Sequence, residues 1–571
     1  MRLSDYIMEE IIALGVKDVF TFVGGGMMYL ADAIGKNKDI TPHFYHHEQA
    51  AGIAAEAYAR ISGKPGFCFV TSGPGGLNAV EAIAECWQDS VPVIFIIGQN
   101  KTQDTTRNSG IEGLRQYGPT EIDLVPVLSS ITKKTICITD DMDFPNVFKD
   151  AYTLAQDCRQ GPVAIIIPID MQKKDIERYS DFLTMDALFK DLKKSRRPVI
   201  IAGQGIRIAK QEKELLRFAA AWQIPVVTTH AGADLLEYDN PLYVGHPGMK
   251  GDRAGNIAVQ NADLIISIGA SLHIFTTGYE LDAFAPEAKI YYIEPDNTLI
   301  RRCKLKNVTP INRSVEQFFI YEYFGTKAEE KGDSWRLKCK LWKKEYQVYN
   351  EKKVSEPGRI DIYDALKVIN EASKEGDIII SDAGSAYYAV SQAWQFKKGQ
   401  RSICSNALGT MGWAIPAAEG AAIANKDANI LCFTGDGSFM TALAALPNIK
   451  LYKNIKVFVF LNDAYLSIRN TQDTFFNGHY VGVDDAHGLV MPYIPNIAEA
   501  MDVSYTCYSK NGTQFNEEHV KLILGSPQPW IVGIYTNIKQ EIIPTTKSYV
   551  DVDGKFVSGK LENMYPYLEE K

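Results

Sequence analysis

Short apolar runs of strand length recur along most of the chain, and helical patterns separate them. Ten such runs are Phe67–Thr71, Val93–Gly98, Val163–Ile167, Pro198–Gly203, Pro225–Thr229, Leu264–Ile268, Ile290–Ile293, Asp377–Ser381, Ile430–Thr434 and Val457–Leu461. Their apolar residues are largely continuous rather than alternating, which is typical of parallel strands buried on both faces. Helices between such strands form right-handed crossovers. The pattern therefore predicts an α/β protein with doubly wound parallel sheets.

Two charged stretches interrupt this rhythm. Residues 171–193 and 327–357 are rich in Lys, Asp and Glu, and we interpret both as connectors between domains, the second containing a solvated helix. A chain of 571 residues is long enough for about three domains. The predicted domains are residues 1–170, 190–325 and 358–545, and a tail of residues 546–571 follows them.

Composition and charge narrow the class of protein. Hydrophobic residues make up 46% of the chain and charged residues 23%, which is ordinary for a globular protein. A net charge of −9 argues against a nucleic-acid binder, which needs a basic face. No apolar run approaches the ~18 residues of a membrane-spanning helix. Nine cysteines without a CxxC pair indicate reduced thiols and no structural zinc, so we expect a cytoplasmic protein.

The strongest chemical signal lies between residues 430 and 464. A buried strand runs into Gly435–Ser438 (GDGS), the stretch 439–452 has a helical pattern, and the next strand ends at Asn462. Adjacent parallel strands bring their carboxyl ends together, where α/β proteins bind ligands. A carboxylate, an amide oxygen and a nearby backbone carbonyl at this edge suit Mg²⁺ or Ca²⁺ shared with a diphosphate rather than zinc, and the free N–H groups of the following helix suit a phosphate. A tight turn would explain GDG alone, but the pairing with Asn462 favours a metal–diphosphate site.

This segment resembles the motif of thiamin-diphosphate (ThDP)-dependent enzymes, which begins GDG and ends NN. The resemblance implies that Asp436, Asn462 and the carbonyl oxygen of Ala464 bind Mg²⁺. The spacing is one residue shorter than the common form of the motif, and Leu461 replaces its first Asn. Because the second Asn is the metal ligand in that family, we expect metal binding to be retained.

A second segment, His46–Ala51 (HHEQAA), opens a helix rich in small residues. A Glu in the first turn of a helix is most often only a favourable partner of the helix dipole. However, the segment resembles the site at which the family's catalytic Glu contacts the pyrimidine ring of ThDP. The resemblance implies that Glu48 is the catalytic residue and drives the tautomer that takes up the cofactor's C2 proton. The other cofactor contacts predicted in this domain are Gly25, Thr71 and Asn78.

The third segment is Leu408–Trp413 (LGTMGW). An isolated Met is usually a core residue, but this run resembles the family's stretch in which a large apolar side chain wedges under the cofactor and holds it bent. The resemblance gives that role to Met411. The loop Asp382–Ala386 fits the family's second diphosphate loop. The predicted cofactor contacts in this domain are Gly384, Ser385, Gly409, Met411, Asp436, Gly437, Ser438, Asn462 and Ala464.

The resemblance covers nearly the whole chain and is closest to acetolactate-synthase-like enzymes. It implies a pyrimidine-binding first domain, a Rossmann-like middle domain and a diphosphate-binding third domain. It also implies a homodimer or homotetramer with the active site at the subunit interface. FAD binding is left open, because relatives often hold a non-redox flavin that Gly203–Ile206 and Gly245–Gly251 could cradle, whereas Ser271 replaces a family Arg.

Two substitutions separate the chain from true acetolactate synthases. Phe275 stands where that enzyme has the Arg that binds its 2-oxoacid acceptor, and Pro119-Thr120 replaces a cavity-lining Phe-Gln. The first change removes a bidentate partner for a carboxylate. Three C-terminal segments instead resemble a subgroup associated with surface-polysaccharide and unusual-sugar biosynthesis: Tyr465–Thr471, Gly478–Val483 and Leu561–Pro566.

The sequence therefore predicts a ThDP- and Mg²⁺-dependent decarboxylating carboligase. Its donor is pyruvate or a similar 2-oxoacid, and its acceptor is a carbonyl compound, for which a keto nucleotide sugar is one candidate. The alternatives are acetolactate synthase proper, a simple 2-oxoacid decarboxylase or lyase, and an inactive ThDP-binding relative. The predicted partners are these small molecules and further copies of the chain, without nucleic acid or membrane.

Overall fold

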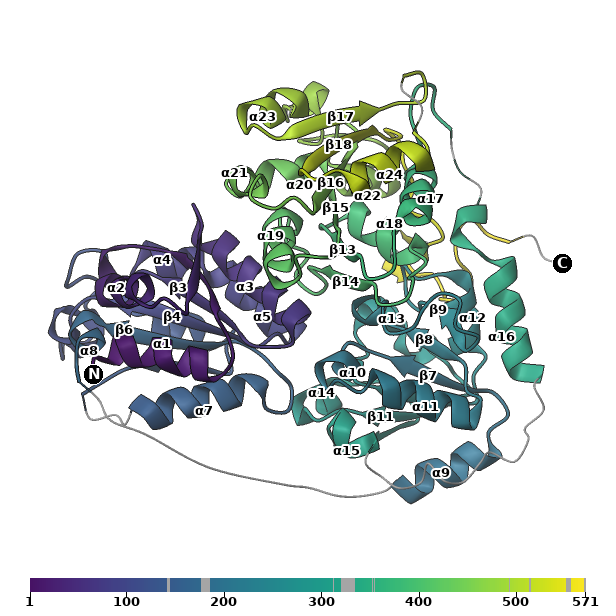
Figure 1. Ribbon diagram of the computed structural model, residues 1–571. Coiled ribbons are helices and arrows are strands. Elements are labelled where there is room, and N and C mark those ends of the chain that lie inside the picture. Colours follow the sequence, from purple (N-terminus) through teal and green to yellow (C-terminus); the bar gives the residue numbers. More distant parts are fainter. Residues whose placement is uncertain are drawn as a thin grey trace.

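The computed structural model describes residues 1–140, 144–175, 185–311, 313–319, 334–351, 353, 355–491, 493–512, 515–550 and 556–568. Three six-stranded sheets organise these residues (Figure 1), and every strand pair within them is parallel. Helices connect the strands and pack on the sheets. The predicted α/β class with doubly wound parallel sheets is confirmed.

The first sheet has the strand order β2-β1-β3-β4-β6-β5. Its strands are β1 (Asp18–Phe22), β2 (Thr41–Phe44), β3 (Gly66–Val70), β4 (Val93–Gln99), β5 (Lys134–Cys137) and β6 (Val163–Pro168). The helices of this part of the chain are α1 (Leu3–Ala13), α2 (Met28–Lys36), α3 (Glu48–Ser62), α4 (Pro74–Asn78), α5 (Val80–Asp89), α6 (Leu124–Leu128), α7 (Phe144–Gln156) and α8 (Ile169–Gln172).

The second sheet has the order β12-β11-β10-β7-β8-β9. Its strands are β7 (Pro198–Ala202), β8 (Val226–Thr228), β9 (Tyr243–Gly245), β10 (Leu264–Ile268), β11 (Lys289–Ile293) and β12 (Val308–Ile311). Counted from β7, this is the 3-2-1-4-5-6 arrangement of a Rossmann domain. The helices here are α10 (Gly205–Ile208), α11 (Glu212–Trp222), α12 (Arg253–Gln260), α13 (Ile274–Thr277), α14 (Asn297–Arg302) and α15 (Val315–Phe319).

The third sheet repeats the strand order of the first, as β14-β13-β15-β16-β18-β17. Its strands are β13 (Ile378–Ser381), β14 (Arg401–Cys404), β15 (Ile430–Gly435), β16 (Ile455–Leu461), β17 (Ser504–Tyr508) and β18 (Trp530–Tyr535). Its helices are α17 (Ile362–Ala372), α18 (Ser385–Ala393), α19 (Ala414–Ala424), α20 (Asp436–Thr441), α21 (Leu446–Ile449), α22 (Leu466–Phe476), α23 (Ile494–Ala500) and α24 (Glu517–Gly525). Helices α3 and α19 therefore occupy equivalent positions in two copies of one topology.

One predicted helix is wrong. The stretch 439–452 forms two short helices, α20 and α21, instead of one continuous helix. Pro447 lies in the first turn of α21, where its missing N–H costs nothing, whereas in a helix interior it would break the hydrogen-bond ladder.

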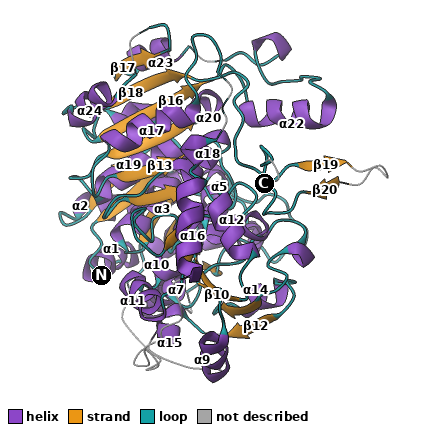
Figure 2. Ribbon diagram, turned by 90° about the vertical axis from the view of Figure 1, so that its right-hand side faces the viewer, coloured by secondary structure: helices purple, strands orange, loops and turns teal. Residues whose placement is uncertain are grey.

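The connectors and the tail pack against the middle of the molecule. Helix α9 (Met185–Lys194) and helix α16 (Ser334–Glu345) belong to the two predicted connectors, of which residues 176–184 and 327–333 lie outside the described part. In the tail, the carbonyl oxygens of Met564 and Pro566 accept hydrogen bonds from Arg253 at 2.9 and 2.5 Å. Strands β19 (Ser548–Val550) and β20 (Phe556–Ser558) form an antiparallel pair that projects from the body (Figure 2).

The first and third sheets are joined through α3 and α19, which pack together (Figure 1). The contact consists of small residues: a Cβ on Gly420 would lie only 2.3 Å from the carbonyl oxygen of Ala54. The two helices run antiparallel, because Arg60 near the end of α3 donates to the carbonyl oxygen of Cys404, just before the loop that enters α19, at 3.0 Å. The helices thus approach as closely as their backbones allow.

The nine cysteines form no disulfide. Within the described ranges, no helix combines the length and the apolar composition that crossing a bilayer requires.

We expect Gly420→Ala to destabilise the protein by about 1–3 kcal/mol, because the added methyl group must push α3 and α19 apart. Thermal unfolding followed by circular dichroism would measure the loss. Gly35→Ala in α2 is the matched control: a Cβ there meets nothing within 4 Å, so the change should be neutral or slightly stabilising. Equal midpoints for both variants would contradict the tight contact.

Candidate active site

Glu48 is the first residue of α3 and is only 3% exposed. The amide of Asn78 in α4 donates to Glu48 Oε2 at 3.0 Å, which orients the carboxylate. The preceding His47 caps the helix, since its Nδ1 accepts from the N–H of Gln49 at 3.3 Å. A buried acid in this position is available to a ligand at the carboxyl end of the first sheet.

A glycine-rich loop after β1 meets the end of β3 beside this acid. The hydroxyl of Thr71 accepts from the N–H of Gly26 at 3.0 Å. A Cβ on Gly75 would lie 3.1 Å from Glu48 Oε1, whereas one on Gly25 would meet nothing within 4 Å. The structure thus gathers Gly25, Thr71 and Asn78 around Glu48, and it leaves open space at Gly25.

The second group lies at the carboxyl end of the third sheet. Asp436 begins α20 directly after β15, and its Oδ2 accepts from the backbone N–H groups of Asn462 at 3.0 Å and Asp463 at 2.8 Å. Its Oδ1 accepts from the N–H of Gly437 at 2.9 Å. Burial raises the pKa of the Asp436 carboxyl to about 7, and the three N–H donors oppose the shift. The carboxylate therefore bridges the ends of β15 and β16.

Asn462 supplies an observation that fits a metal ion. Its side-chain oxygen is buried and has no hydrogen-bond partner, a situation that costs about 1–3 kcal/mol unless a ligand satisfies the atom. Ala464 is 2% exposed on the loop that follows. A carboxylate, an amide oxygen and a backbone carbonyl are the donor set that Mg²⁺ prefers. Leu461 packs against Gly533, where a Cβ would lie 2.9 Å from it, so this departure from the motif serves the core.

The remaining residues of α20 lie close to the same loop. A Cβ on Gly437 would lie 2.2 Å from the ring of Tyr465, so only Gly fits there. Ser438 is buried in the first turn of α20. Across the edge, Gly384 adopts φ +71 at the start of α18, and Ser385 Oγ lies 3.3 Å from Ser467 Oγ at the start of α22.

Asp382 joins these elements, and the sequence did not single it out. It is fully buried. Its Oδ1 accepts from the N–H of Gly412 at 2.9 Å and its Oδ2 from the hydroxyl of Thr434 at 2.9 Å. Burial raises its pKa to about 6, and its N–H and hydroxyl donors oppose the shift. The only signal in the sequence was an Asp directly after an apolar strand.

Met411 lies on the loop between β14 and α19 and is 38% exposed. It is therefore not a core residue. Gly409 adopts φ +70, and a Cβ there would meet nothing within 4 Å. The loop thus presents a bare backbone and a large apolar side chain at the edge that Asp382 organises.

Within one chain, the group around Glu48 and the group around Asp436 and Met411 are each assembled, but they do not meet. Arg60, near the end of α3, contacts the start of the loop that carries Met411, whereas Glu48 begins α3, twelve residues earlier. At 1.5 Å per residue this separation is about 18 Å along the helix. Glu48 and Met411 consequently lie at opposite ends of the α3–α19 pair.

Comparisons with known proteins identify the family of this chain. Three family models match: the N-terminal TPP-binding domain of thiamine pyrophosphate enzymes over residues 1–126, the central domain over residues 185–318, and the C-terminal TPP-binding domain over residues 382–534. Acetolactate synthase 2 of Zea mays is 30% identical over 593 residues, which cover 97% of this chain and 89% of the relative. The chain belongs to the acetolactate-synthase-like family of ThDP-dependent enzymes.

Other members of this acetolactate-synthase-like family show similar coverage. The acetolactate synthase of Arabidopsis thaliana is 28% identical over 573 residues, covering 95% of this chain and 83% of the relative, and acetolactate synthase 1 of Oryza sativa subsp. japonica is 28% identical over 591 residues, covering 97% and 88%. Thiamine pyrophosphate is another name for ThDP, which is therefore the cofactor of this enzyme. Glu48 lies in the N-terminal match, and Asp436, Asn462 and Met411 lie in the C-terminal one.

A buried acidic cluster lies between the two ThDP-binding domains. Carboxylate oxygens of Glu56, Glu85 and Asp89 lie within 4.8 Å of one another, the spacing of a metal site. The guanidinium of Arg60 stands among them, donating to Glu56 and, at 2.6 Å, to Asp89. The cluster is therefore an internal ion-pair network.

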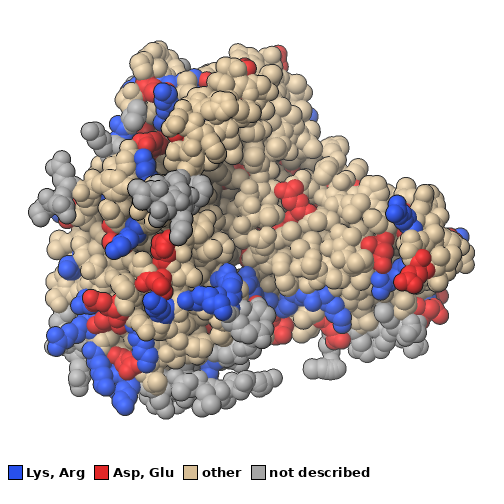
Figure 3. Space-filling model, turned by 180° about the vertical axis from the view of Figure 1, so that it is seen from behind, with Lys and Arg blue, Asp and Glu red and all other residues tan. Residues whose placement is uncertain are grey.

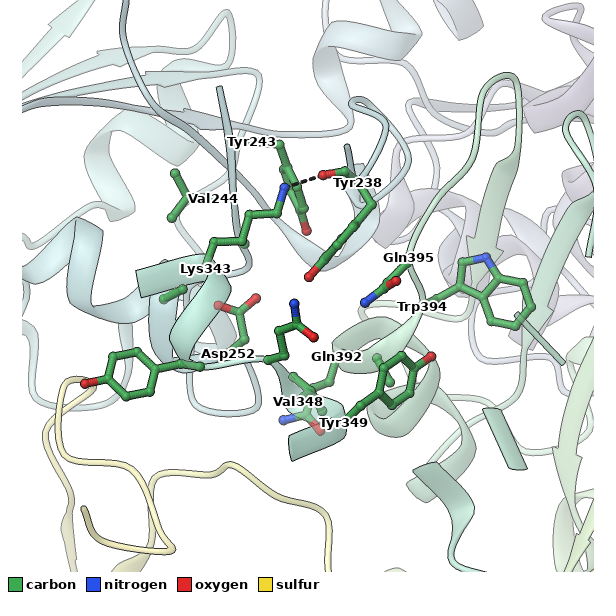
Figure 4. Close-up of a pocket in the computed structure, with 15 residues that line it drawn as sticks. Tyr238, Tyr243, Val244, Asp252, Lys343, Val348, Tyr349, Gln392, Trp394 and Gln395 are labelled. Carbon is green, nitrogen blue, oxygen red and sulfur yellow. Dashed lines mark hydrogen bonds between the residues drawn. The ribbon is translucent and has the colours of Figure 1, made fainter. Parts of the chain in front are cut away.

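A separate small pocket lies where the middle sheet meets α16 and α18 (Figure 4). Lys343 reaches across it, with its Nζ donating to the carbonyl oxygen of Tyr238 and lying 4.8 Å from the ring centre of Tyr243. Burial lowers the pKa of Lys343 to about 8. None of the residues predicted to contact ThDP lines this pocket, whereas Gly245, from the run suggested as a flavin cradle, does. The pocket belongs to the packing of the connector.

The acidic cluster makes stability depend on pH. Burial raises the pKa of Glu85 from 4.5 to about 9, with contributions from Glu56 and Asp89, while hydrogen bonding to Ser405 and the charge of Arg60 oppose it. The folded state therefore holds this proton more tightly than the unfolded chain, so the free energy of unfolding falls as pH rises through this range. We expect Glu85→Gln to lose less thermal stability than the wild type between about pH 6 and about pH 8.5. Parallel losses would show that Glu85 does not titrate in this way.

Proposed function

We propose that this enzyme is a ThDP- and Mg²⁺-dependent carboligase that decarboxylates pyruvate or a similar 2-oxoacid and joins the remaining fragment to a carbonyl acceptor. The observation that carries the proposal is the buried, unpartnered oxygen of Asn462 beside Asp436. In a chain that belongs to a ThDP-dependent family, a cation that binds a diphosphate satisfies this oxygen best.

The residues of the third sheet would bind the diphosphate side of the cofactor. Bound ThDP supplies an electron sink that lets a 2-oxoacid lose CO₂ and lets its remainder add to a carbonyl. Asp436, Asn462 and the carbonyl oxygen of Ala464 would hold Mg²⁺, and Met411 would support the cofactor rings. The residues that would contact the diphosphate are Gly384, Ser385, Gly409, Gly437 and Ser438.

The residues of the first sheet would bind the pyrimidine. Glu48 would hold a proton at a ring nitrogen, and its hydrogen bond from Asn78 keeps the carboxylate in one orientation. Burial strengthens such a bond because little water competes for it. Gly25 and Thr71 would line the space in which the ring lies.

Because Glu48 and Met411 lie at opposite ends of one helix pair, a complete site needs a second copy of the chain. Large apolar side chains are exposed beside both groups: Leu77 is 41% exposed, Leu408 40% and Met411 38%. Figure 3 shows one face on which uncharged residues dominate over much of the surface, while Lys and Arg gather at the lower left. The exposed apolar side chains beside both groups support a homodimer or a tetramer built from dimers.

The acceptor side is aromatic where true acetolactate synthases have an Arg. The ring centre of Phe275 lies 5.5 Å from that of His273 and 6.3 Å from that of Tyr388, which lies one turn after Ser385 in α18. These rings offer a sugar or nucleotide ring a surface to pack against. The cation near them is Lys250, whose Nζ lies 5.8 Å from the centre of the Tyr388 ring, and it lacks the bidentate geometry of an Arg. This supports a keto nucleotide sugar over a second 2-oxoacid as acceptor.

FAD binding by the middle domain stays a prediction. The glycines that suggested a cradle serve backbone packing: a Cβ on Gly203 would lie 2.1 Å from the carbonyl oxygen of Gly269, and one on Gly248 would lie 2.1 Å from that of Phe275. The proposed reaction needs no redox step from a flavin.

We expect the enzyme to release CO₂ from pyruvate when ThDP and Mg²⁺ are present, and Glu48→Gln to reduce kcat at least about 100-fold, because the amide cannot exchange the proton. A coupled CO₂ assay measures both. Glu9→Gln, at an exposed position in α1, is the control and should keep full activity. Full activity in Glu48→Gln would refute the proposed mechanism.

Complementation tests the shared site in the same assay. A heterodimer of a Glu48→Gln chain and an Asp436→Asn chain has both defects in one site and none in the other. Co-expression should therefore restore activity that neither variant has alone. An inactive heterodimer that still binds ThDP would argue that each chain completes its own site.

We expect Phe275→Arg to raise acetolactate formation from pyruvate alone by roughly tenfold, because the guanidinium can pair with the carboxylate of a second pyruvate. Mass spectrometry of the products, with and without keto nucleotide sugars, measures the change. Efficient acetolactate formation by the wild type would identify acetolactate synthase proper, and free acetaldehyde with every acceptor would identify a simple decarboxylase.

A further inference from the structure

The loop between Cys404 and Trp413 carries Met411, and its own domain holds it at few points. The N–H of Thr410 donates to Ser405 Oγ at 2.7 Å, and the N–H of Gly412 donates to Asp382 at 2.9 Å. In the first half of the loop, the hydroxyl of Tyr387 in α18 donates to Asn406 Oδ1 at 2.6 Å, while the main chain of Asn406 and Ala407 is bound from outside the domain.

The N-terminal domain of the same chain supplies these outside contacts. Asp89, the last residue of α5, accepts from the backbone N–H groups of Asn406 at 3.2 Å and Ala407 at 3.1 Å. Glu85, one turn earlier in α5, accepts from the hydroxyl of Thr410 at 3.1 Å. Both acids therefore bind the loop on the approach to Met411.

Helix α3 holds the two ends of the loop. Arg60 donates to the carbonyl oxygen of Cys404 at 3.0 Å, and the indole N–H of Trp413 donates to Glu56 at 3.1 Å. The guanidinium of Arg60 also lies 5.5 Å from the centre of the Trp413 ring. Every segment of the loop except Leu408-Gly409 and Met411 itself is thus tied to a neighbour.

Burial makes these contacts costly to break. Glu85 is 1% exposed, and Asp89 and Thr410 are each 5% exposed. Removing a partner leaves a buried polar group unsatisfied, which costs more than a surface hydrogen bond contributes. The acids are better explained as anchors than as metal ligands, because Arg60 pairs with Glu56 and Asp89, and the loop's own N–H and hydroxyl groups bind Asp89 and Glu85.

We propose that Asp89 and Glu85 are positioning residues for the reaction: they fix the loop from across the domain boundary so that Met411 lies at the height that bends the cofactor. This inference rests on the proposed role of Met411. It gives α3 and α5 a second task, since the domain that supplies Glu48 to one active site sets the position of Met411 in the other.

The test compares Asp89→Asn and Thr410→Val with wild-type holoenzyme. Asp89→Asn replaces one of the two carboxylate oxygens, which accept from two N–H groups, with an NH₂ group that donates. Thr410→Val removes the hydroxyl that Glu85 binds and keeps the volume of the side chain. We expect kcat per bound ThDP to fall roughly ten- to a hundredfold, with KM for pyruvate changed less than about twofold. Asp39→Asn, exposed in the same domain, is the matched control.

A readout independent of turnover accompanies the assay. The near-ultraviolet circular dichroism difference between ThDP-loaded and ThDP-free protein reports the conformation of the bound rings, and we expect it to change in both variants. Unchanged kcat and an unchanged difference spectrum in folded variants would overturn the inference, as would a loss explained by thermal stability alone. If Asp89→Asn fails to fold, Thr410→Val decides.

The same measurements separate this inference from the proposed function. A wild type that binds ThDP but releases no CO₂ from 2-oxoacids would refute the proposed reaction, while the difference spectrum would still show whether Asp89 and Thr410 set the cofactor's conformation. Met411→Ala, measured alongside, should reproduce the spectral change of the two variants, and a wild-type spectrum in Met411→Ala would overturn the inference.

Discussion

Where α3 crosses α19, backbone meets backbone, and no side chain fits between Gly420 and Ala54. Both helices follow the second strand of the same sheet topology, so their contact relates two copies of one architecture. Because α3 and α19 pack antiparallel, each helix begins beside the end of the other. Glu48 and Met411 are separated by this geometry, and the proposed division of the active site between two chains rests on it.

The sequence predicted the interior of the sheets better than their edges. All ten apolar runs form interior strands. The six edge strands were not among them, because they are short and lack long apolar runs, and all of them except the buried β9 are partly exposed. Strands β2 and β12 even contain Pro42 and Pro310, which edges tolerate. Two interior strands were also missed. The polar residues Asp18 and Thr21 interrupt β1, and Gly533 interrupts β18.

Prediction of the site residues from the sequence had a similar limit. The residues proposed to contact the cofactor stand in short motifs, so Glu48, Asp436 and Asn462 could be proposed from resemblance and chemistry. Asp382 and Asp89 bind backbone N–H groups, and Glu85 binds the hydroxyl of Thr410; these partners are far away in the sequence, and only the fold brings them together. A buried acid that binds N–H groups has no sequence signature, because any loop can present an amide.

The interface between the first and third domains determines which domains can be exchanged between related proteins. Three α/β units suggest exchangeable modules, but each contacts the next directly. The middle unit meets the third through Asp234, which binds Arg401 and the N–H of Ser402, as well as through a connector and a tail. The outer two also share buried acids of one domain bound to the loop of the other, and their helices leave no gap. The first and third domains therefore have to be exchanged together. A chimera that takes residues 1–170 and 358–545 from one parent keeps their interface intact. A chimera that takes them from different parents requires both parents to have the same distance between the two backbones.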